Sequence, residues 1–471
     1  MVDLLDLGLD DRLAGELPGE EEILGHLGTP GRPHAADVLR AAEAAGRPVV
    51  QPRCGVGGHE EMLGLLRALE AAGPGILSVT IDSHTRLRGF DAAAELLRRA
   101  PSDLNGYPMV AHGWRRGREL AASVGVPLEV RHGSPDAREL FAVSLASGIT
   151  SFEGGGVGYN LPYSKDVPLE VSLRAWQRVD AACGRLAEAG VVVDRELFGT
   201  LTAVLMPPSI SLAVTLLEAV AAAREGVRCL SIAYAQGGEP HQDVAALRAI
   251  RVLARRYLDE KVEVYPVLHE FMGVFPRTPD YGGALILCGG LVARLGGAAK
   301  VVSKTVQEAY GIPDSAANAA GIRAAALGAS ELLDFVLIDE DRVAEERHWI
   351  EREVAELVDP VLGDGGDLLA AIVAAFRAGR LDVPFSASVH ARSNVVPRRD
   401  RDGAIRYADP GDLPFSPDVL RRNARLLEGG GPGDTGPDLF GAITADIDYF
   451  LDRERRSLAG RDPLTDRFRM R

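Results

Sequence analysis

Residues 229–271 contain an apolar run, CLSIAYAQGG (229–238), then HQDVAALRAIRVLARRYL (241–258), then a second apolar run, VEVYPVLHEF (262–271). In the middle segment apolar residues recur at i, i+3, i+4 and i+7, which is the stripe that an amphipathic helix buries. The flanking runs are short and bounded by turn-forming or polar residues, so they predict buried strands. Strand, helix, strand in this order predicts a parallel βαβ unit.

The same alternation extends in both directions from this unit. Amphipathic segments such as HEEMLGLLRALEAAG (59–73) and SPDARELFAVSLASG (134–148) separate further short apolar runs. Eight repeats predict an α/β protein with a (β/α)8 TIM barrel over residues 49–330 that carries the active site. An open doubly wound sheet would show the same periodicity and stays a second interpretation. The eight predicted strands are 49–53, 76–82, 107–113, 127–133, 149–155, 229–238, 262–271 and 299–305.

The remaining segments flank or interrupt this alternation. Residues 1–48 predict an N-terminal helical extension with a break at GTPGRPH, and the long crossover 156–228 contains a helix at 168–190 and a loop-like stretch, RELFGTLTAVLMPPS. Residues 331–471 predict a C-terminal extension that is helix-rich to about residue 380. Within it we expect a β-hairpin near 398–407, turning at Asp402-Gly403, and a flexible Gly/Pro segment at 428–438.

Composition narrows the class of protein. The chain has 471 residues and a formal net charge of −15, which argues against a nucleic-acid partner. No run of about 18 apolar residues is present, so no membrane span is expected. The N-terminal stretch is acidic and lacks the features of a signal peptide. Four widely spaced cysteines predict reduced core thiols rather than a zinc site, and we expect a cytoplasmic protein.

Charged residues fall at the predicted strand ends. Arg53 ends the first predicted strand, Arg86 follows the second, Arg131 ends the fourth and Glu153 ends the fifth. The carboxyl ends of barrel strands meet on one face, where barrel enzymes carry their active sites. Three arginines there would repel one another without an anion, and guanidinium groups bind carboxylates in bidentate pairs. This pattern favours a substrate with two carboxylates.

Each of these residues also has a plainer interpretation. A strand-end arginine is often a rim ion pair, and the glycines of EGGG (153–156) could form an ordinary turn or an anion cradle. Tyr159 and Tyr163 could be packing residues, and His269 a core histidine. Lys304 could be a solvated rim residue or a Schiff-base lysine.

Seven motifs in order resemble one family, the large (epsilon, or E) subunit of coenzyme-B12-dependent methylaspartate mutase, also called glutamate mutase. The resemblance covers about residues 45–425 and rests on QPRCGV (51–56), TIDSHTR (80–86), LNGYP (104–108), RHGSPDAR (131–138), EGGGVGYNLPYSK (153–165), LHEFMGVFP (268–276) and KTVQEAYGIP (304–313). It implies a (β/α)8 barrel and an isomerase. The implied reaction is a reversible radical rearrangement of L-glutamate to (2S,3S)-3-methylaspartate with adenosylcobalamin.

The resemblance also implies roles for individual residues. Glu153 and Tyr159 match the catalytic residues, with Glu153 facing the substrate amine, and we expect Glu153 to be ionised near neutral pH. The implied substrate-binding residues are Arg53, Arg86, Arg131, His132, Glu153, Tyr159 and Tyr163. The implied cofactor-binding residues are Gly55, Thr80, Asn105, Pro162, Phe275, Lys304, Glu308 and Ile312. The glycines after Glu153 would let backbone approach the substrate or the corrin closely.

The resemblance further implies a partner protein. The cobalamin signature D-x-H-x-x-G belongs to a separate small subunit, and here Asp82 and His84 are followed by Gly89, two positions too late. The cobalt-ligating histidine is therefore expected on that small cobalamin-binding subunit, with a homodimer of this chain inside a heterotetramer, and no metal ligand is expected here. Two alternatives stay open: a B12-free barrel lyase or aldolase using Lys304, and a non-catalytic scaffold for a small cobalamin protein.

Overall fold

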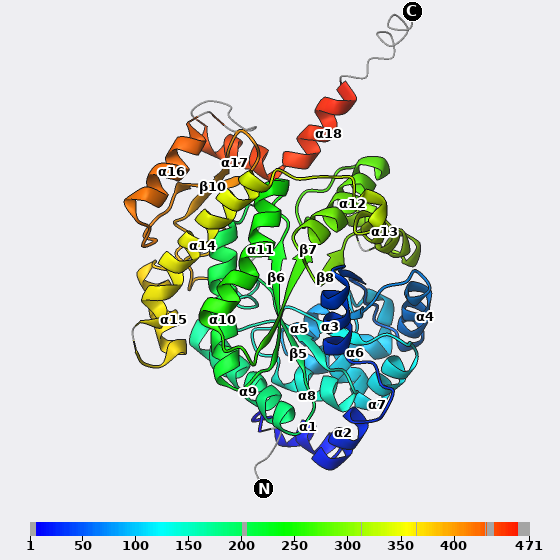
Figure 1. Ribbon diagram of the computed structural model, residues 1–471. Helices are drawn as coiled ribbons and strands as arrows, with labels where there is room; N and C mark the ends of the chain where they lie inside the picture. The colour runs from blue at the N-terminus through cyan, green and yellow to red at the C-terminus, as the bar shows by residue number, and fades with distance from the viewer. Residues whose placement is uncertain are drawn as a thin grey trace, which may run out of the picture.

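A parallel sheet of eight strands forms the centre of the molecule (Figure 1). The computed structural model describes residues 6–199, 205–311, 313–363, 365–428, 430 and 438–459. Strand order is β1-β8-β7-β6-β5-β4-β3-β2, so the last strand returns to the first and the sheet is nearly closed. This confirms the predicted (β/α)8 barrel. The strands are β1 (Val49–Pro52), β2 (Leu77–Thr80), β3 (Leu128–Arg131), β4 (Ser151–Glu153), β5 (Asp194–Leu197), β6 (Cys229–Ala235), β7 (Glu263–His269) and β8 (Lys300–Ser303).

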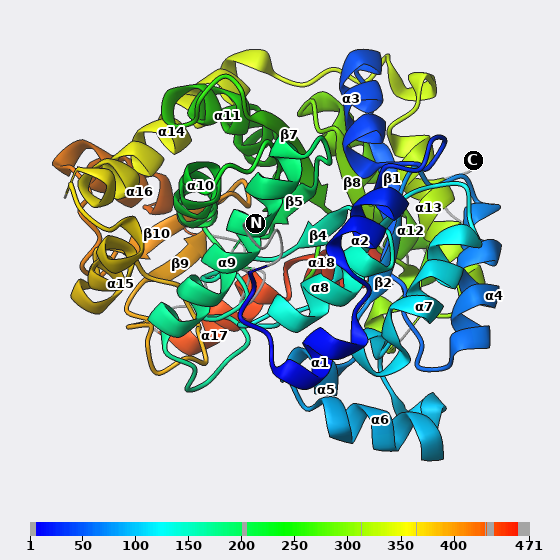
Figure 2. The ribbon, with the colours of Figure 1, turned by 90° about the horizontal axis from the view of Figure 1, so that it is seen from below.

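Helices between the strands form the outer layer of the barrel (Figure 2). Their apolar faces pack on the sheet, and α10 is buried along nearly its whole length because the C-terminal extension covers it. The helices of this layer are α4 (His59–Glu70), α5 (Ser83–Arg86), α6 (Phe90–Arg99), α7 (Met109–Ala122), α8 (Arg138–Ala146), α9 (Leu169–Glu188), α10 (Pro208–Arg224), α11 (Pro240–Tyr257), α12 (Pro279–Leu295) and α13 (Ser315–Gly328).

One predicted strand is wrong and one strand was missed. In the segment predicted as the strand 107–113, only Tyr107 pairs, through a single bridge to Ile81, and α7 begins two residues later. The missed strand is β5, because its residues from Arg195 onward were predicted to form a loop. The number of barrel strands is therefore as predicted, but Arg131 ends the third strand and Glu153 the fourth.

The hydrogen-bond ladders between strands do not continue around the whole barrel. Among the described strands, β1 and β2 share no ladder. Pro52 has no N–H, and the hydroxyl of Ser78 donates instead to the Pro52 carbonyl at 2.5 Å. Two backbone bonds also cross this seam, from Gly75 to Val50 (3.0 Å) and from Thr80 to Cys54 (2.8 Å).

The N-terminal residues form helices, as predicted. They are α1 (Asp11–Glu16), α2 (Glu20–Leu27) and α3 (Ala35–Ala45), with the predicted break between α2 and α3. Figure 2 shows α1 and α2 across the underside of the molecule. Arg32 donates to the Gly148 carbonyl (3.3 Å) and Trp114 donates to the Glu16 carbonyl (3.0 Å), which ties this segment to the barrel.

The C-terminal extension packs on one side of the barrel and reaches over its top (Figure 1). It contains α14 (Glu340–Leu362), α15 (Leu368–Ala378), the hairpin β9 (Val396–Arg399) and β10 (Ile405–Asp409), α16 (Pro417–Leu427), α17 (Leu439–Ile447) and α18 (Tyr449–Ala459). The predicted hairpin is confirmed, and Gly403 takes a positive φ of 100° at its turn. The predicted flexible segment 428–438 lies mostly outside the described residues. Within the described part of the chain, no helix has the length and apolar character needed to cross a bilayer.

Candidate active site

The predicted site residues lie where the barrel strands end. Parallel strands of a barrel present their carboxyl ends on one face, so residues far apart in the chain meet there. Strand-terminal or immediately following positions are held by Arg53 (β1), Arg131 (β3), Glu153 (β4), His269 (β7) and Lys304 (β8), while Arg86 is the last residue of α5, after β2.

Arg131 lies at the centre of a buried ionic network. Its Nη1 donates to Gln51 (3.2 Å) and to Glu129, and its Nη2 donates to Glu153 and to Glu196 (3.2 Å). Burial alone would lower the pKa of Arg131, but the three carboxylates raise it well above its ordinary value. The charge of Arg131 is therefore balanced by the protein itself, and the expectation that all three arginines need an external anion is wrong for this one.

Two further groups complete the network. His269 Nε2 lies 2.8 Å from Glu196 Oε1 and 3.1 Å from Arg131 Nη2, and burial lowers the pKa of His269 to about 3. Lys300 forms ion pairs with Glu196 (2.5 Å) and with Glu129. Glu153, Glu196 and His269 have residue types that can bind a metal, and ligand atoms within 4.8 Å of one another. However, the guanidinium of Arg131 already contacts all three and supplies the positive charge.

Arg53 and Arg86 differ from Arg131. Both are half-buried, and among the described residues neither guanidinium group makes a hydrogen bond or ion pair. Arg86 Nε is buried without a partner among the described atoms. A Cβ on Gly133 would lie 3.6 Å from both Arg86 Cδ and Tyr163 Cδ1, so Arg86 and Tyr163 pack side by side over this glycine. These two guanidiniums are free to bind an anion.

Glu153 is buried, and its protonation differs from the prediction. Burial raises the pKa of Glu153 to about 7, with Glu196 and Glu129 adding to the shift and Arg131 opposing it. The expectation of a carboxylate ionised near neutral pH rested on the arginines and the substrate ammonium and did not include the neighbouring acids. A carboxyl group with this pKa can hold or release a proton at neutral pH.

Aromatic side chains close the site beside Glu153. The His132 ring stacks on Trp176 with ring centroids 5.6 Å apart, and Tyr159 meets the His132 edge at 4.9 Å. Tyr159 also packs against Tyr163 at 5.6 Å, and Tyr163 is 42% exposed. Burial and then the charge of Arg195 hold the pKa of His132 well below its ordinary value, so this ring is neutral. Burial, then Glu153, raises the pKa of Tyr159, which therefore keeps its proton.

The glycines after Glu153 make room for protein groups. Gly154 has a φ of 122°, and a Cβ there would lie 2.5 Å from the Tyr159 ring and 2.7 Å from Trp176. A Cβ on Gly155 would lie 2.3 Å from the carboxylate of Glu218, which belongs to α10. At these two glycines the absence of a Cβ therefore makes room for protein side chains. The prediction was that it would make room for the substrate or the corrin.

The residues predicted to bind a cofactor lie around the same barrel face. Lys304 Nζ donates to Glu308 at 3.1 Å, and burial lowers the pKa of Lys304. Gly55 packs on Thr80, because a Cβ there would lie 2.3 Å from the Thr80 carbonyl oxygen. Of the others, Asn105 is exposed and accepts from the Ser83 amide (2.9 Å), Pro162 shares a turn with Tyr159 and Tyr163, Phe275 is buried, and Ile312 lies outside the described residues.

Two acidic partners of Arg131, Glu129 and Glu196, were not predicted from the sequence. Glu196 was missed together with its strand, although Asp194 and Glu196 alternate with Arg195 and Leu197 as a two-faced strand requires. Glu129 lies between apolar residues in a strand that was predicted. A charged residue on the inner face of a barrel strand could have indicated a buried ion pair.

A parallel barrel whose strand ends carry a buried carboxyl group, a lysine–glutamate pair and two guanidinium groups without a described partner has the make-up of a barrel enzyme. Comparison with known proteins makes the class specific. The family model "Methylaspartate mutase E chain (MutE)" matches residues 29–447, and the chain belongs to this family.

Two relatives illustrate the similarity. The chain is 40% identical over 446 residues to the glutamate mutase epsilon subunit of Haloarcula marismortui, covering 93% of this chain and 90% of that protein. It is 41% identical over 382 residues to the glutamate mutase epsilon subunit of Desulfitobacterium hafniense, covering 79% of this chain and 78% of the relative.

Proposed function

We propose that this chain is the catalytic subunit of a methylaspartate mutase, an isomerase that interconverts L-glutamate and (2S,3S)-3-methylaspartate. The observation that carries the proposal is the family match across residues 29–447, with relatives near 40% identity that are named glutamate mutase epsilon subunits. Two free arginines and a buried carboxyl group at one barrel face support it, because the substrate carries two carboxylates and one ammonium group.

The polar groups around Lys304 fit the cofactor adenosylcobalamin. Thr80 Oγ1 is buried without a hydrogen-bond partner among the described residues, next to Gly55. Lys304 offers N–H donors and the half-buried Glu308 offers an acceptor, a combination that suits ribose hydroxyls. When bound, adenosylcobalamin supplies the radical chemistry of the carbon-skeleton rearrangement.

In this proposal the arginines hold the substrate carboxylates. Arg53 and Arg86 contribute complete guanidinium forks, because no described residue occupies them. Arg131 contributes through Nε, which is buried and has no hydrogen-bond partner in the described part of the chain, while its Nη atoms stay on the carboxylates of the network. Bidentate pairing fixes the orientation of the substrate as well as its position.

Glu153 binds the substrate ammonium and accepts its proton, for which a pKa near 7 is suited. Tyr159 keeps its hydroxyl proton and donates a hydrogen bond to the substrate. The rings of His132, Trp176 and Tyr159 keep water away from reactive species in the site.

We further propose that a small cobalamin-binding subunit supplies the cobalt-ligating histidine, within a cytoplasmic heterotetramer. The segment that begins like the cobalamin signature has a local role in the fold. Asp82 Oδ1 caps α5 by accepting from the amides of His84 (2.9 Å) and Thr85 (3.0 Å).

Reconstitution tests this function. The purified chain is combined with a small D-x-H-x-x-G protein, adenosylcobalamin and L-glutamate, and 3-methylaspartate is detected by NMR. We expect product only when both proteins are present. Turnover by this chain alone would contradict the partner requirement, and no product from the full mixture would contradict the mutase function.

A Schiff-base lyase is the second candidate, because burial lowers the pKa of Lys304 in the direction that favours a nucleophilic amine. Borohydride trapping in the presence of substrate distinguishes the two. A covalent adduct on Lys304 would favour the lyase, and cobalamin-dependent turnover without an adduct favours the mutase.

A further inference from the structure

The loop between β4 and α9 carries two of the site tyrosines and follows Glu153 directly. Residues 156–163 form consecutive turns, held by bonds such as Tyr159 N to Gly155 O (3.0 Å). Two amides in this loop, those of Val157 and Gly158, instead find their acceptor on another element. The acceptor is the side chain of Glu218, which lies some sixty residues further along the chain.

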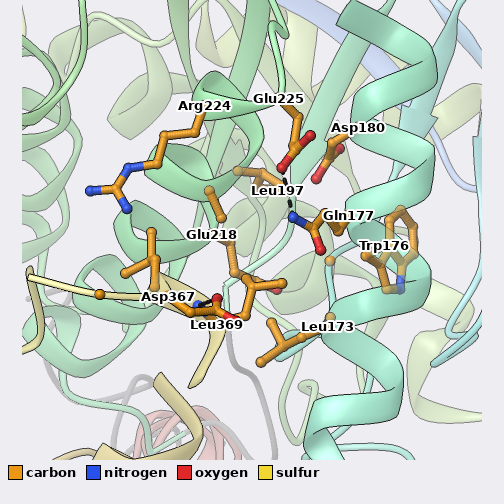
Figure 3. Close-up of a pocket in the computed structure, with 15 residues that line it drawn as sticks. Leu173, Trp176, Gln177, Asp180, Leu197, Glu218, Arg224, Glu225, Asp367 and Leu369 are labelled. Carbon is orange, nitrogen blue, oxygen red and sulfur yellow. Dashed lines mark hydrogen bonds between the residues drawn. The ribbon is translucent and has the colours of Figure 1, made fainter. Parts of the chain in front are cut away.

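Glu218 enters this loop from α10 (Figure 3). One oxygen, Oε1, accepts from the amides of Val157 (2.7 Å) and Gly158 (3.4 Å). The side chain is 5% exposed, and Oε2 is buried without a hydrogen-bond partner among the described residues. A buried amide that loses its acceptor is costly, so the loop conformation depends on this carboxyl group.

Two glycines of the loop leave space for the carboxyl group of Glu218. A Cβ on Gly155 would lie 2.3 Å from Oε1, and a Cβ on Gly158 would lie 3.4 Å from Oε2. The loop therefore wraps closely around the carboxyl group. Any residue with a side chain at Gly155 would expel it.

Within the described part of the chain, Glu218 forms no ion pair. Arg195 favours the charged form of Glu218, but its guanidinium donates to Asp180 Oδ1 at 2.8 Å. Other charged groups, Arg224, Glu225 and Asp367, line the adjoining cavity. Burial raises the pKa of Glu218 to about 7, and Asp180 adds to this shift. Glu218 thus acts through hydrogen bonds rather than through an ion pair.

A cavity of about 210 Å³ adjoins the carboxyl group between α9, α10 and the start of α15 (Figure 3). Its lining includes Gly155, Gly156 and Trp176, so it shares a wall with the candidate active site. The loop has room to shift toward this cavity when its acceptor is removed. A shift of the loop would displace Tyr159, which packs on Trp176 and His132.

We infer that Glu218 is a positioning residue for the proposed reaction: by accepting from the Val157 and Gly158 amides it fixes the loop that places Tyr159 beside Glu153. It touches neither the substrate nor the cofactor. The catalytic part of this inference rests on the mutase function proposed above, whereas the structural part does not.

The test compares two substitutions with opposite consequences. Glu218→Gln keeps an acceptor oxygen at Oε1, and Glu218→Leu removes it. The matched control is Glu353→Leu, because Glu353 is also buried and accepts from Ser209 (2.7 Å) and Asn423 (3.0 Å) but belongs to α14, away from the loop. All three variants lose a buried carboxyl group.

Hydrogen exchange on the full chain gives the first measurement and needs no substrate. We expect amides of residues 155–163 to exchange at least about ten-fold faster in Glu218→Leu, and at the parental rate in Glu218→Gln and Glu353→Leu. Parental exchange in Glu218→Leu, or equal acceleration in the control, would overturn the inference.

Steady-state kinetics of the reconstituted complex give the second measurement. We expect kcat per folded molecule to fall by at least about ten-fold in Glu218→Leu, with a smaller change in KM for glutamate. Glu218→Gln should recover kcat to within a few-fold, which a merely stabilising residue would not require. A normal kcat in Glu218→Leu overturns the positioning role. Absence of turnover in the parent contradicts the mutase proposal, and the hydrogen-exchange result then decides whether Glu218 fixes the loop.

Discussion

Glu153 shows how burial and neighbouring charges set the state of a single carboxyl group. It bonds to Arg131, yet burial and the nearby Glu196 and Glu129 raise its pKa to about 7. A strand-end acid that looks well balanced in sequence is therefore poised between two protonation states. This property suits a group that must take up the proton of a substrate ammonium.

The first prediction follows from this pKa. In the parent complex, kcat/KM should rise with pH through about 7, because the deprotonated form of Glu153 accepts the ammonium proton. Glu153→Gln keeps the size of the side chain but loses basicity, so kcat should fall by about 10²-fold and the rise near pH 7 should disappear. A Gln variant with near-normal kcat would exclude Glu153 from the mechanism.

The second prediction separates the arginines. Arg53→Lys and Arg86→Lys should weaken glutamate binding by about ten-fold or more without lowering the melting temperature, because neither guanidinium bonds to another described residue. Arg131→Lys should lower both activity and melting temperature, since it removes bonds to Gln51 and to three carboxylates. Arg98→Lys, on an exposed helix surface, serves as the control. Equal melting temperatures in all four variants would contradict the network around Arg131.

At the level of secondary structure, strands were predicted from their apolar runs. The prediction failed for a strand that is buried by charged rather than apolar residues. In β5, Arg195 lies on the outer side of the sheet and donates to Asp180, while Asp194 on the inner side accepts from Ser151 and Ser231. A strand buried by ion pairs and hydrogen bonds on both faces has no apolar run to detect.

The opposite error occurred at YPMVAHG (107–113). Tyr107 makes one bridge to Ile81, and Pro108 then precedes α7, which Gly113 interrupts with a φ of 75°. A few apolar residues cannot distinguish a strand from the first turn of a helix. Site residues on correctly predicted strands could be located from the sequence. Glu196 was missed together with its strand, whereas Glu218 could not be located because its partners, the Val157 and Gly158 amides, are set by tertiary packing.

The third prediction concerns α18. The carboxylate of Glu454 accepts from the Arg277 amide (2.9 Å), the Thr278 amide (2.8 Å) and the Thr278 hydroxyl (2.7 Å), just before α12 begins. Glu454→Leu should leave these groups without an acceptor and destabilise the loop by about 1–3 kcal/mol. Hydrogen exchange should then accelerate over residues 271–278, which include Phe275. Unchanged exchange there would show that α18 does not fix this loop.

At the level of the whole molecule, buried acids link stability to pH. Burial raises the pKa of Glu218 to about 7 and that of Asp243 to about 6, so the folded protein holds these protons more tightly than the unfolded chain does. The resulting stability is fully present at acidic pH, below the ordinary carboxyl pKa. It is lost as pH rises through about 6 to 7.

The fourth prediction tests this linkage. The melting temperature of the parent relative to Glu218→Gln should decrease as pH rises from 5 to about 7 and then level off, because only the parent loses the Glu218 proton. Thermal unfolding at several pH values measures the difference. A difference that increases with pH would show that Glu218 is stabilised as the anion instead.

The seam between β1 and β2 has a mechanical consequence. A barrel with continuous hydrogen-bond ladders between all neighbouring strands resists a change of circumference, whereas a barrel with one weakly bonded strand pair opens most easily at that joint. Here the joint is crossed by the Thr80–Cys54 and Gly75–Val50 backbone bonds and by the Ser78 hydroxyl. Gly55 and Thr80 lie directly beside it. We therefore expect the barrel to yield at this joint, where a few bonds rather than a continuous ladder hold the two strands together.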